Sequence, residues 1–293
     1  MGESLLRIIY IDGETFSHSG LISDKFYQDI IENKYDKSRG PEIDNSTNTN
    51  HSQKLHIMVQ GDSYTWGQGI RKDEDIYTSQ LLKRIRQKKP EAQMAVLAKR
   101  GREIDGHIDQ LKHWSSEIMP DVIIYQWHIT DIERSRSDRP EGITPPWSIF
   151  FLHNWLIKNS FLWFFLDHQA RLVLPAPSHS YADYIKESYT PGTPGWEIFR
   201  NKFEAWAKLA KKQTPNIIVF LPAQSTDDNI ESAFIEMAKK MELIVLRNGD
   251  VTKQHPSSMF DRHPNPTAHK IFADNLYQIC DNLMMSTNES GQR

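Results

Sequence analysis

The sequence predicts an α/β protein, a three-layer α/β/α domain built on a doubly wound, five-stranded parallel sheet with a helical insertion. Five short apolar runs, most of them rich in valine and isoleucine, have the pattern of strands buried on both faces. Segments with helical periodicity separate them. Strictly alternating strands and helices imply parallel strands joined by crossover helices. The chain has 293 residues, 38% of them hydrophobic and 25% charged, which is enough to bury a large core.

The elements follow one another in a regular order from residue 55 onward. We predict strands at 55–60, 93–98, 121–127, 216–221 and 242–246. Helices are predicted where apolar residues recur three or four positions apart, around 76–85, 104–111, 199–209, 230–241 and 271–279. The last helix closes the domain.

The domain organisation follows from breaks in this alternation. Residues 1–54 are predicted to be an N-terminal extension that ends in a polar linker, and 55–285 the α/β domain. An aromatic-rich insertion at about 132–195 separates the third strand from the next helix, and 286–293 are expected to be a disordered tail.

The insertion contains a long aromatic segment at 147–166. Polar residues, among them His153, Asn154 and Lys158, interrupt it too often for a transmembrane span. It is either a core helix of an inserted subdomain, an aromatic lid over a site, or a helix that contacts a membrane surface. Prolines 175, 177, 191 and 194 predict an irregular return path after it.

Composition excludes several classes of function. The net charge is −3 and no long basic run occurs, which argues against nucleic acid as a main partner. The single cysteine, Cys280, excludes an internal disulfide and is predicted to lie in the core. The spacing of the histidines relative to cysteines and acids does not suggest metal ligation at positions 107, 113, 153, 168, 179 and 255. We expect neither a metal nor a cofactor. The start does not read as a secretory signal, which leaves a cytoplasmic protein or a trimmed secreted or periplasmic one. The oligomeric state stays open.

The candidate site lies where the strands end, because open parallel sheets bind ligands outside the carboxyl ends of their strands. Ser63 follows the first strand in the stretch 61–69, at a predicted strand-to-helix turn. Gly101 follows the second strand, and His128 to Asp131 follow the third. Asp261 and His263 precede the final helix. These loops are predicted to meet at one edge of the sheet.

The residue types in these loops suit nucleophilic catalysis. A serine hydroxyl attacks only when an adjacent base takes its proton, and the ordinary pKa of histidine suits His263 for that task. Asp261 would fix the tautomer of the imidazole. The backbone N–H groups of Ser63 and Gly101 are candidate donors to an oxyanion.

These residues carry a resemblance to a known family. Gly61-Asp62-Ser63, then Gly101, then Asp261-x-His263-Pro264-Asn265 resemble the blocks of the SGNH (GDSL-type) hydrolases, and Ala268-His269 add to the match. The similarity runs from about 55 to 283, apart from the insertion. It implies a flavodoxin-like sheet, a Ser–His–Asp triad, no metal, and ester or acyl chemistry on lipids, carbohydrates or small esters.

The sequence departs from that family at Thr130, which stands where the family has the asparagine that donates to the oxyanion. Either Thr130 or another donor such as His128 takes its place, or activity is reduced. His128, Arg100 and Asp62 are candidate substrate-binding residues, and Asp62 is also expected to hold the turn through its hydrogen bonds. Three hypotheses follow: an ester hydrolase, an O-acyltransferase that uses the same triad on a glycan or other hydroxyl, and a binding protein without catalysis.

Overall fold

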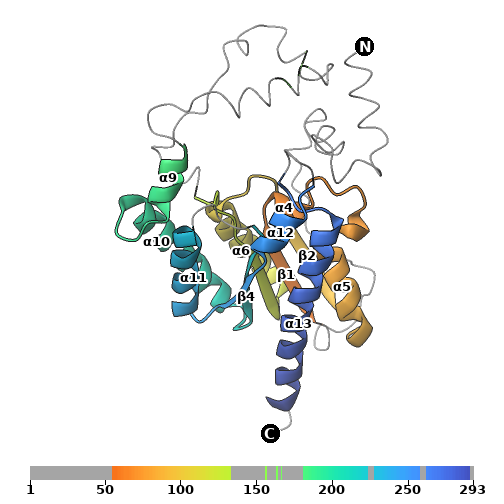
Figure 1. Cartoon of the computed structure of the whole chain (residues 1–293). Coiled ribbons are helices and arrows are strands. Elements are labelled where there is room, and N and C mark those ends of the chain that lie inside the picture. The colour runs from red at the N-terminus through yellow and green to blue at the C-terminus, as the bar shows by residue number, and fades with distance from the viewer. Residues whose placement is uncertain are drawn as a thin grey trace, which may run out of the picture.

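A computed structural model describes residues 55–132, 181–223, 228–257 and 262–290, together with Leu156, Trp163 and Leu166. It contains a five-stranded parallel sheet in the order β2-β1-β3-β4-β5 (Figure 1). This is the doubly wound order of flavodoxin-like sheets, so the predicted fold is confirmed. The strands are β1 (His56–Gly61), β2 (Gln93–Ala98), β3 (Val122–Gln126), β4 (Ile217–Leu221) and β5 (Ile244–Arg247).

The three central strands are buried along their whole length, as strands covered on both faces must be. β1 pairs with β2 from His56↔Gln93 to Gly61↔Ala98, and with β3 on its other side. Because β1 and β3 are neighbours, the loops that follow them begin side by side at the carboxyl edge of the sheet.

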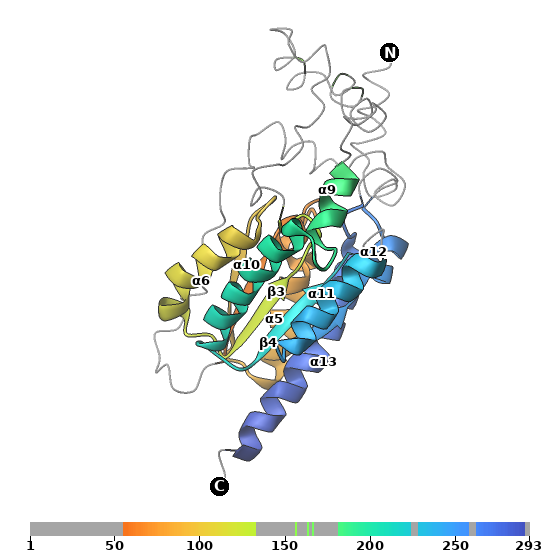
Figure 2. The same ribbon diagram turned by 90° about the vertical axis from the view of Figure 1, so that its left-hand side faces the viewer.

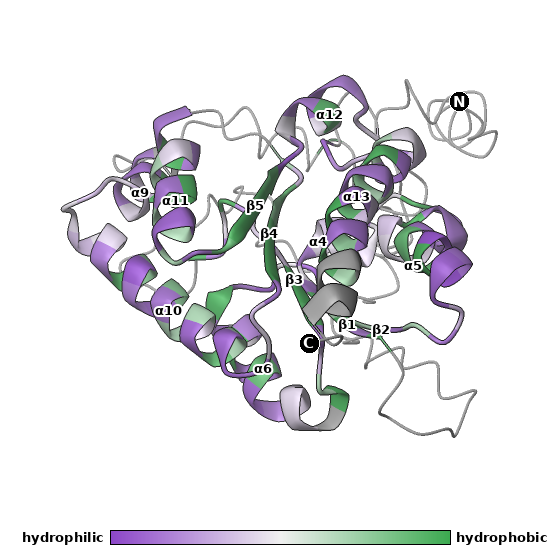
Figure 3. Cartoon of the chain, turned by 90° about the horizontal axis from the view of Figure 1, so that it is seen from below, coloured by the Kyte–Doolittle hydropathy of each residue, from purple (hydrophilic) through white to green (hydrophobic). Residues whose placement is uncertain are grey.

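Helices cover both faces of the sheet, as the views along and across it show (Figures 2 and 3). One layer packs an aromatic-rich core that includes Phe199, Phe203 and Trp206 against the sheet. The other layer packs around Tyr77, Leu81 and Phe272. The first layer consists of α6 (Ile104–Ile118), α9 (Tyr181–Ser188), α10 (Pro194–Lys211) and α11 (Asp228–Lys240), and the second of α5 (Tyr77–Lys88) and α13 (Pro266–Ser290).

Three features differ from the sequence-based prediction. β5 is only partly buried rather than covered on both faces, because it is the edge strand of the sheet. A short helix, α12 (Gly249–Gln254), lies between β5 and the loop that carries His263. Pro194 is not part of an irregular path but begins α10, where Thr193 caps the helix and a proline needs no N–H partner.

The end of the predicted insertion belongs to the core of the domain, since Tyr184, Ile185 and Tyr189 are buried in the aromatic-rich cluster. The extension 1–54 and the segment 147–166, except for three helical residues, lie outside the described part of the chain. α13 continues to Ser290, past the predicted start of the tail at residue 286. Among the helices that the structure describes, none has the length and apolar character needed to cross a membrane.

Candidate active site

Ser63 is the first residue of a one-turn helix, α4 (Ser63–Trp66), that begins directly after β1. Asp62 caps this helix, and its Oδ1 accepts a hydrogen bond from the Tyr64 N–H at 2.9 Å. Gly67 ends it in the left-handed conformation, with φ of 78°. The short helix therefore holds Ser63 at the carboxyl edge of the sheet, directly after β1 (Figure 1).

A buried glutamine of β3 ties this turn to the sheet. The side-chain Oε1 of Gln126 accepts hydrogen bonds from the Asp62 N–H at 2.9 Å and from Thr65 Oγ1 at 3.0 Å. The Tyr77 hydroxyl lies 2.8 Å from Thr65 Oγ1 and donates to it, because the threonine proton already goes to Gln126. Burial raises the pKa of Tyr77, which keeps this phenol protonated. Gln126 fixes the backbone next to Ser63.

The geometry brings His263 to Ser63 across 200 residues of sequence. His263 Nε2 lies 2.8 Å from Ser63 Oγ, a hydrogen-bonding distance. The loop that carries the histidine is held by the Ser257 N–H, which donates to the His263 carbonyl at 2.6 Å, and by the Asn265 N–H, which donates to the His255 carbonyl at 3.0 Å.

The Pro264-Asn265 pair of the motif has a structural explanation. The Asn265 side chain accepts a hydrogen bond from the Ala268 N–H at 3.1 Å, which caps α13, and Pro266 opens that helix. His269, one turn further, accepts a hydrogen bond from the Tyr77 N–H at 3.2 Å. The start of α13 thus fixes where the His263 loop ends.

Tyr64 joins two histidines at the site. Its ring centroid lies 5.0 Å from that of His263 and 5.2 Å from that of His128. His128 is partly buried, and its Nδ1 lies 2.8 Å from Thr130 Oγ1 and 3.6 Å from Asp62 Oδ2. Burial lowers the pKa of His128, His263 lowers it further, and the Asp62 charge opposes both.

The turn that presents His128 is held from below by a buried carboxyl group. Asp131 Oδ2 accepts hydrogen bonds from the Tyr125 hydroxyl and from the His128 N–H, the latter at 3.3 Å. Burial raises the pKa of Asp131 well above its usual range, and Asp62 raises it further. The Asp131 carbonyl accepts from the Ile104 N–H at 2.9 Å, which fixes the turn against the start of α6.

The loop after β2 lies beside the Ser63 turn, since the Lys99 N–H donates to the Gly61 carbonyl at 3.2 Å. Gly101 has a φ of 61°, in the left-handed region that favours glycine. The guanidinium of Arg100 lies over the ring of Trp66, 5.6 Å from its centroid. Asp261 lies outside the described residues, so its role in the triad stays a prediction.

Sequence reasoning missed Gln126 and the part played by Tyr64. Gln126 is a polar residue at the end of an otherwise apolar strand, which is the signal that would have found it. Tyr64 directly follows Ser63 in the motif, but nothing in the sequence indicates that its ring lies between two histidines.

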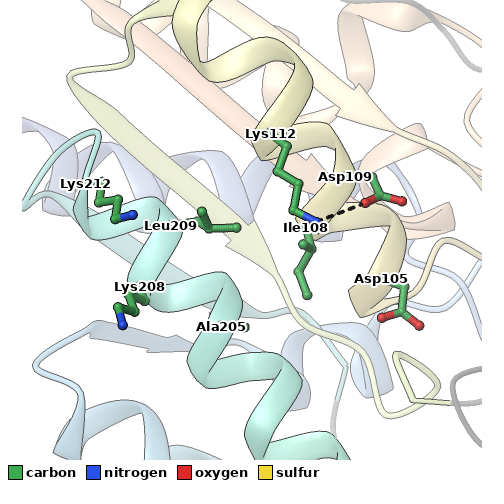
Figure 4. A pocket seen from close by; sticks show the side chains of 8 residues that line it. All are labelled: Asp105, Ile108, Asp109, Lys112, Ala205, Lys208, Leu209 and Lys212. Atoms are coloured by element: carbon green, nitrogen blue, oxygen red, sulfur yellow. Dashed lines mark ion pairs between the residues drawn. The ribbon is translucent and has the colours of Figure 1, made fainter.

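A groove of about 570 Å³ lies elsewhere, between α6 and α10 (Figure 4). Its lining includes Ile108 and Leu209, with Lys112, Lys208 and Lys212 beside them, and it contains neither Ser63 nor His263. No group of three or more histidine, cysteine or acidic residues suited to a metal occurs within the described part of the chain.

Comparison with known proteins gives structural likenesses only. No family model and no curated protein matches the chain. Among solved structures, TesA is similar at 11% identity and a TM-score of 0.48, over 79% of this chain and 99% of its own. A catalytic mutant of an acetylxylan esterase from Geobacillus stearothermophilus shares 12% identity at 0.46, over 80% of this chain and 96% of its own. A putative GDSL-like lipase from Parabacteroides merdae shares 14% identity at a TM-score of 0.46, over 78% of this chain and 97% of its own.

Two of these structures are thus an acetylxylan esterase and a putative GDSL-like lipase, and the second carries the family name that the motifs of this chain predict. Likeness at this level of identity and TM-score decides nothing about the reaction.

Proposed function

We propose that the protein is an ester hydrolase of the SGNH type that cleaves a carboxylic ester with Ser63 as the nucleophile and His263 as the base. The observation that carries this proposal is the 2.8 Å distance between His263 Nε2 and Ser63 Oγ. A serine hydroxyl activated by an adjacent imidazole is the arrangement that acyl transfer requires.

In the first half of the reaction, Ser63 Oγ attacks the ester carbonyl carbon and its proton passes to His263 Nε2. The C=O π electrons move to the carbonyl oxygen, which becomes an oxyanion. When this intermediate collapses, the bond to the alcohol oxygen breaks, and the imidazolium of His263 gives its proton to the leaving alkoxide. The products are an acyl-Ser63 ester and a free alcohol.

In the second half, a water molecule gives a proton to His263 while its oxygen attacks the acyl carbon. Collapse releases the carboxylic acid and returns the proton to Ser63. If a sugar or other hydroxyl replaces water, the same steps transfer the acyl group, which is the O-acyltransferase alternative. The donor–acceptor geometry of Ser63 and His263 serves both reactions equally.

The oxyanion requires donors that are already in place. The backbone N–H of Ser63, beside the buried cap residue Asp62, is one proposed donor, and that of Gly101 is the second. We assign Asp261 to orient His263 and to stabilise its charged form, as the motif predicts.

Hydrolysis of p-nitrophenyl acetate and of longer acyl esters tests the proposal. Ser63→Ala and His263→Gln are expected to lower kcat/KM by about 10³-fold or more, because the two residues act as a unit. Ser116→Ala and His113→Gln, exposed positions on α6, are matched controls that should leave the rate unchanged. Cleavage that survives both site variants would refute the proposal, and a folded protein that cleaves no ester of the panel would favour a binding role.

The same assay separates hydrolysis from transfer when a polyol acceptor is added. An acylated polyol that forms at the expense of free acid, and only with Ser63 intact, would show an acyltransferase. Free acid as the sole product at every acceptor concentration would show a hydrolase.

A further inference from the structure

Thr130 occupies the place of the family's donor asparagine, but its hydroxyl is already engaged. Thr130 Oγ1 lies 2.8 Å from Nδ1 of His128. The third donor to the oxyanion therefore has to be sought at the residue that the threonine contacts. His128 lies two residues before Thr130 on the same loop and shares a neighbour, Tyr64, with the base His263.

The contacts at Nδ1 determine which ring nitrogen of His128 carries the proton. The backbone N–H of Thr130 is directed at Nδ1 at 3.4 Å, and a backbone N–H can only donate. Nδ1 is therefore the accepting nitrogen, so the Thr130 hydroxyl at 2.8 Å donates to it as well. A neutral imidazole that accepts at Nδ1 carries its proton on Nε2.

The surroundings keep the ring neutral. Burial and the neighbouring His263 both lower the pKa of His128 below its ordinary value, and only the Asp62 carboxylate works in the other direction. That carboxylate oxygen is 3.6 Å from Nδ1, outside hydrogen-bonding range, and Asp62 accepts from the Tyr64 N–H through its other oxygen.

The other ring nitrogen of His128, Nε2, makes no hydrogen bond among the described residues. The side chain of His128 is 19% exposed, and its hydrogen-bonding contacts within the described residues all involve Nδ1. The Nε2–H group is the part of the ring left to donate to a bound molecule. It projects further from the backbone than the hydroxyl of Thr130 does, because an imidazole is longer than a threonine side chain.

We propose that the Nε2–H group of His128 is the side-chain donor to the oxyanion that forms when Ser63 attacks, and that Thr130 is a positioning residue that fixes the tautomer of His128. No proton is transferred from His128: its Nε2–H bond stays intact and a hydrogen bond to the oxyanion forms. The proposal rests on the ester-hydrolase function, and it gives the Asn-to-Thr departure a chemical reason.

Kinetics of ester hydrolysis test the donor. His128→Ala is expected to lower kcat by about 10²–10³-fold while KM changes by less than about threefold, as for the loss of one oxyanion donor. His128→Gln restores an N–H donor and should recover at least about tenfold of that loss. Thr130→Val removes the hydroxyl that holds the ring and should lower kcat by about tenfold, while Thr130→Ser keeps it and should stay within about threefold. His113→Ala, on the exposed face of α6, is the matched control.

The ring itself provides a readout that needs no turnover. ¹⁵N NMR of histidine-labelled protein reports the tautomer, and we expect His128 to be protonated at Nε2 in the folded protein and in the Thr130→Ser variant. In the adduct of Ser63 with a fluorophosphonate, whose phosphoryl oxygen stands in for the oxyanion, the Nε2–H proton should move downfield.

The outcomes separate this inference from the proposed function. If Ser63→Ala is inactive but His128→Ala keeps kcat within about threefold, or if the ring is protonated at Nδ1, the role of His128 is refuted and the hydrolase stands. If Ser63→Ala keeps full activity, the hydrolase mechanism fails and the role of His128 fails with it. If His128→Ala is slow and His128→Gln is no faster, His128 has a structural role and does not donate to the oxyanion.

Discussion

Replacing Gln126 with leucine should weaken both the fold and the reaction, because this side chain ties the Ser63 turn to the sheet. The substitution removes the acceptor of the Asp62 N–H and of the Thr65 hydroxyl. Asp62 is only 3% exposed, so water does not replace the lost partner and the stranded N–H costs about 1–3 kcal/mol. The bond from Thr65 adds about 1 kcal/mol, although Thr65 keeps its contact with Tyr77.

One term offsets part of this loss. The Gln126 side-chain nitrogen is buried without a hydrogen-bond partner among the described residues, so its removal returns about 1 kcal/mol. The net loss in the free energy of unfolding is about 2 kcal/mol. At an m-value of about 2 kcal/mol/M, the midpoint of urea unfolding should fall by about 1 M. The fluorescence of the 8 tryptophans follows the transition.

A second buried glutamine separates stability from catalysis. Gln60 accepts from Trp206 Nε1 at 2.9 Å and donates to the His107 carbonyl at 2.8 Å, on the α6 and α10 side of the sheet. Gln60→Leu should destabilise the fold to a similar extent but keep kcat within about threefold. Gln126→Leu should lower kcat by about tenfold or more, because the backbone beside Ser63 shifts. Equal kcat values in the two variants would refute the positioning role of Gln126.

Three further predictions concern the scaffold. A Cβ at Gly61 would lie 2.0 Å from Thr65 Oγ1, so Gly61→Ala should unfold at a urea midpoint at least about 1 M lower than wild type; an unchanged midpoint would contradict the packing of the turn. Burial lowers the pKa of His107 from 6.5 to about 3. Between these two pH values the unfolded chain binds a proton at His107 and the folded protein does not. The stability that is present above pH 6.5 is therefore lost as the pH falls toward 3. At pH 5 the loss in the free energy of unfolding is about 2 kcal/mol, and His107→Phe should abolish this contribution in urea titrations at pH 7.5 and 5. If wild type and His107→Phe lose the same stability between the two pH values, the role of His107 is refuted. Burial raises the pKa of the Cys280 thiol to about 12, so a disulfide reagent should label it only after unfolding, and rapid labelling of the folded protein would place the thiol elsewhere.

The sheet could be predicted from the sequence because each of its strands is a short apolar run bounded by polar residues. The apolar pattern predicts the second strand with the bounds that the structure has, Gln93–Ala98. The edge position of β5 cannot be predicted, since an apolar pair such as Ile244 and Val245 suits both an edge strand and a central strand. The short α12 was missed because Gly249–Gln254 contains too few apolar residues to show a helical period.

The approach of Ser63 to His263 can be predicted from topology, because Ser63 follows the first strand and His263 lies in the connection between the last strand and the final helix. The contacts that orient the residues around this pair cannot be predicted in the same way. That Thr130 bonds to the ring of His128, and that Gln126 accepts from Asp62, depends on rotamers and on distances between adjacent strands. A linear sequence gives residue types and spacing but not these distances.

Labelling with a fluorophosphonate, followed by mass-spectrometric mapping of the modified peptide, tests the central claim most directly. The Ser63 Oγ, 2.8 Å from His263 Nε2, should take the phosphonate with 1:1 stoichiometry, and His263→Gln should slow that labelling by about 10³-fold or more. A folded protein whose Ser63 stays unmodified, or whose labelling rate does not depend on His263, would contradict the account.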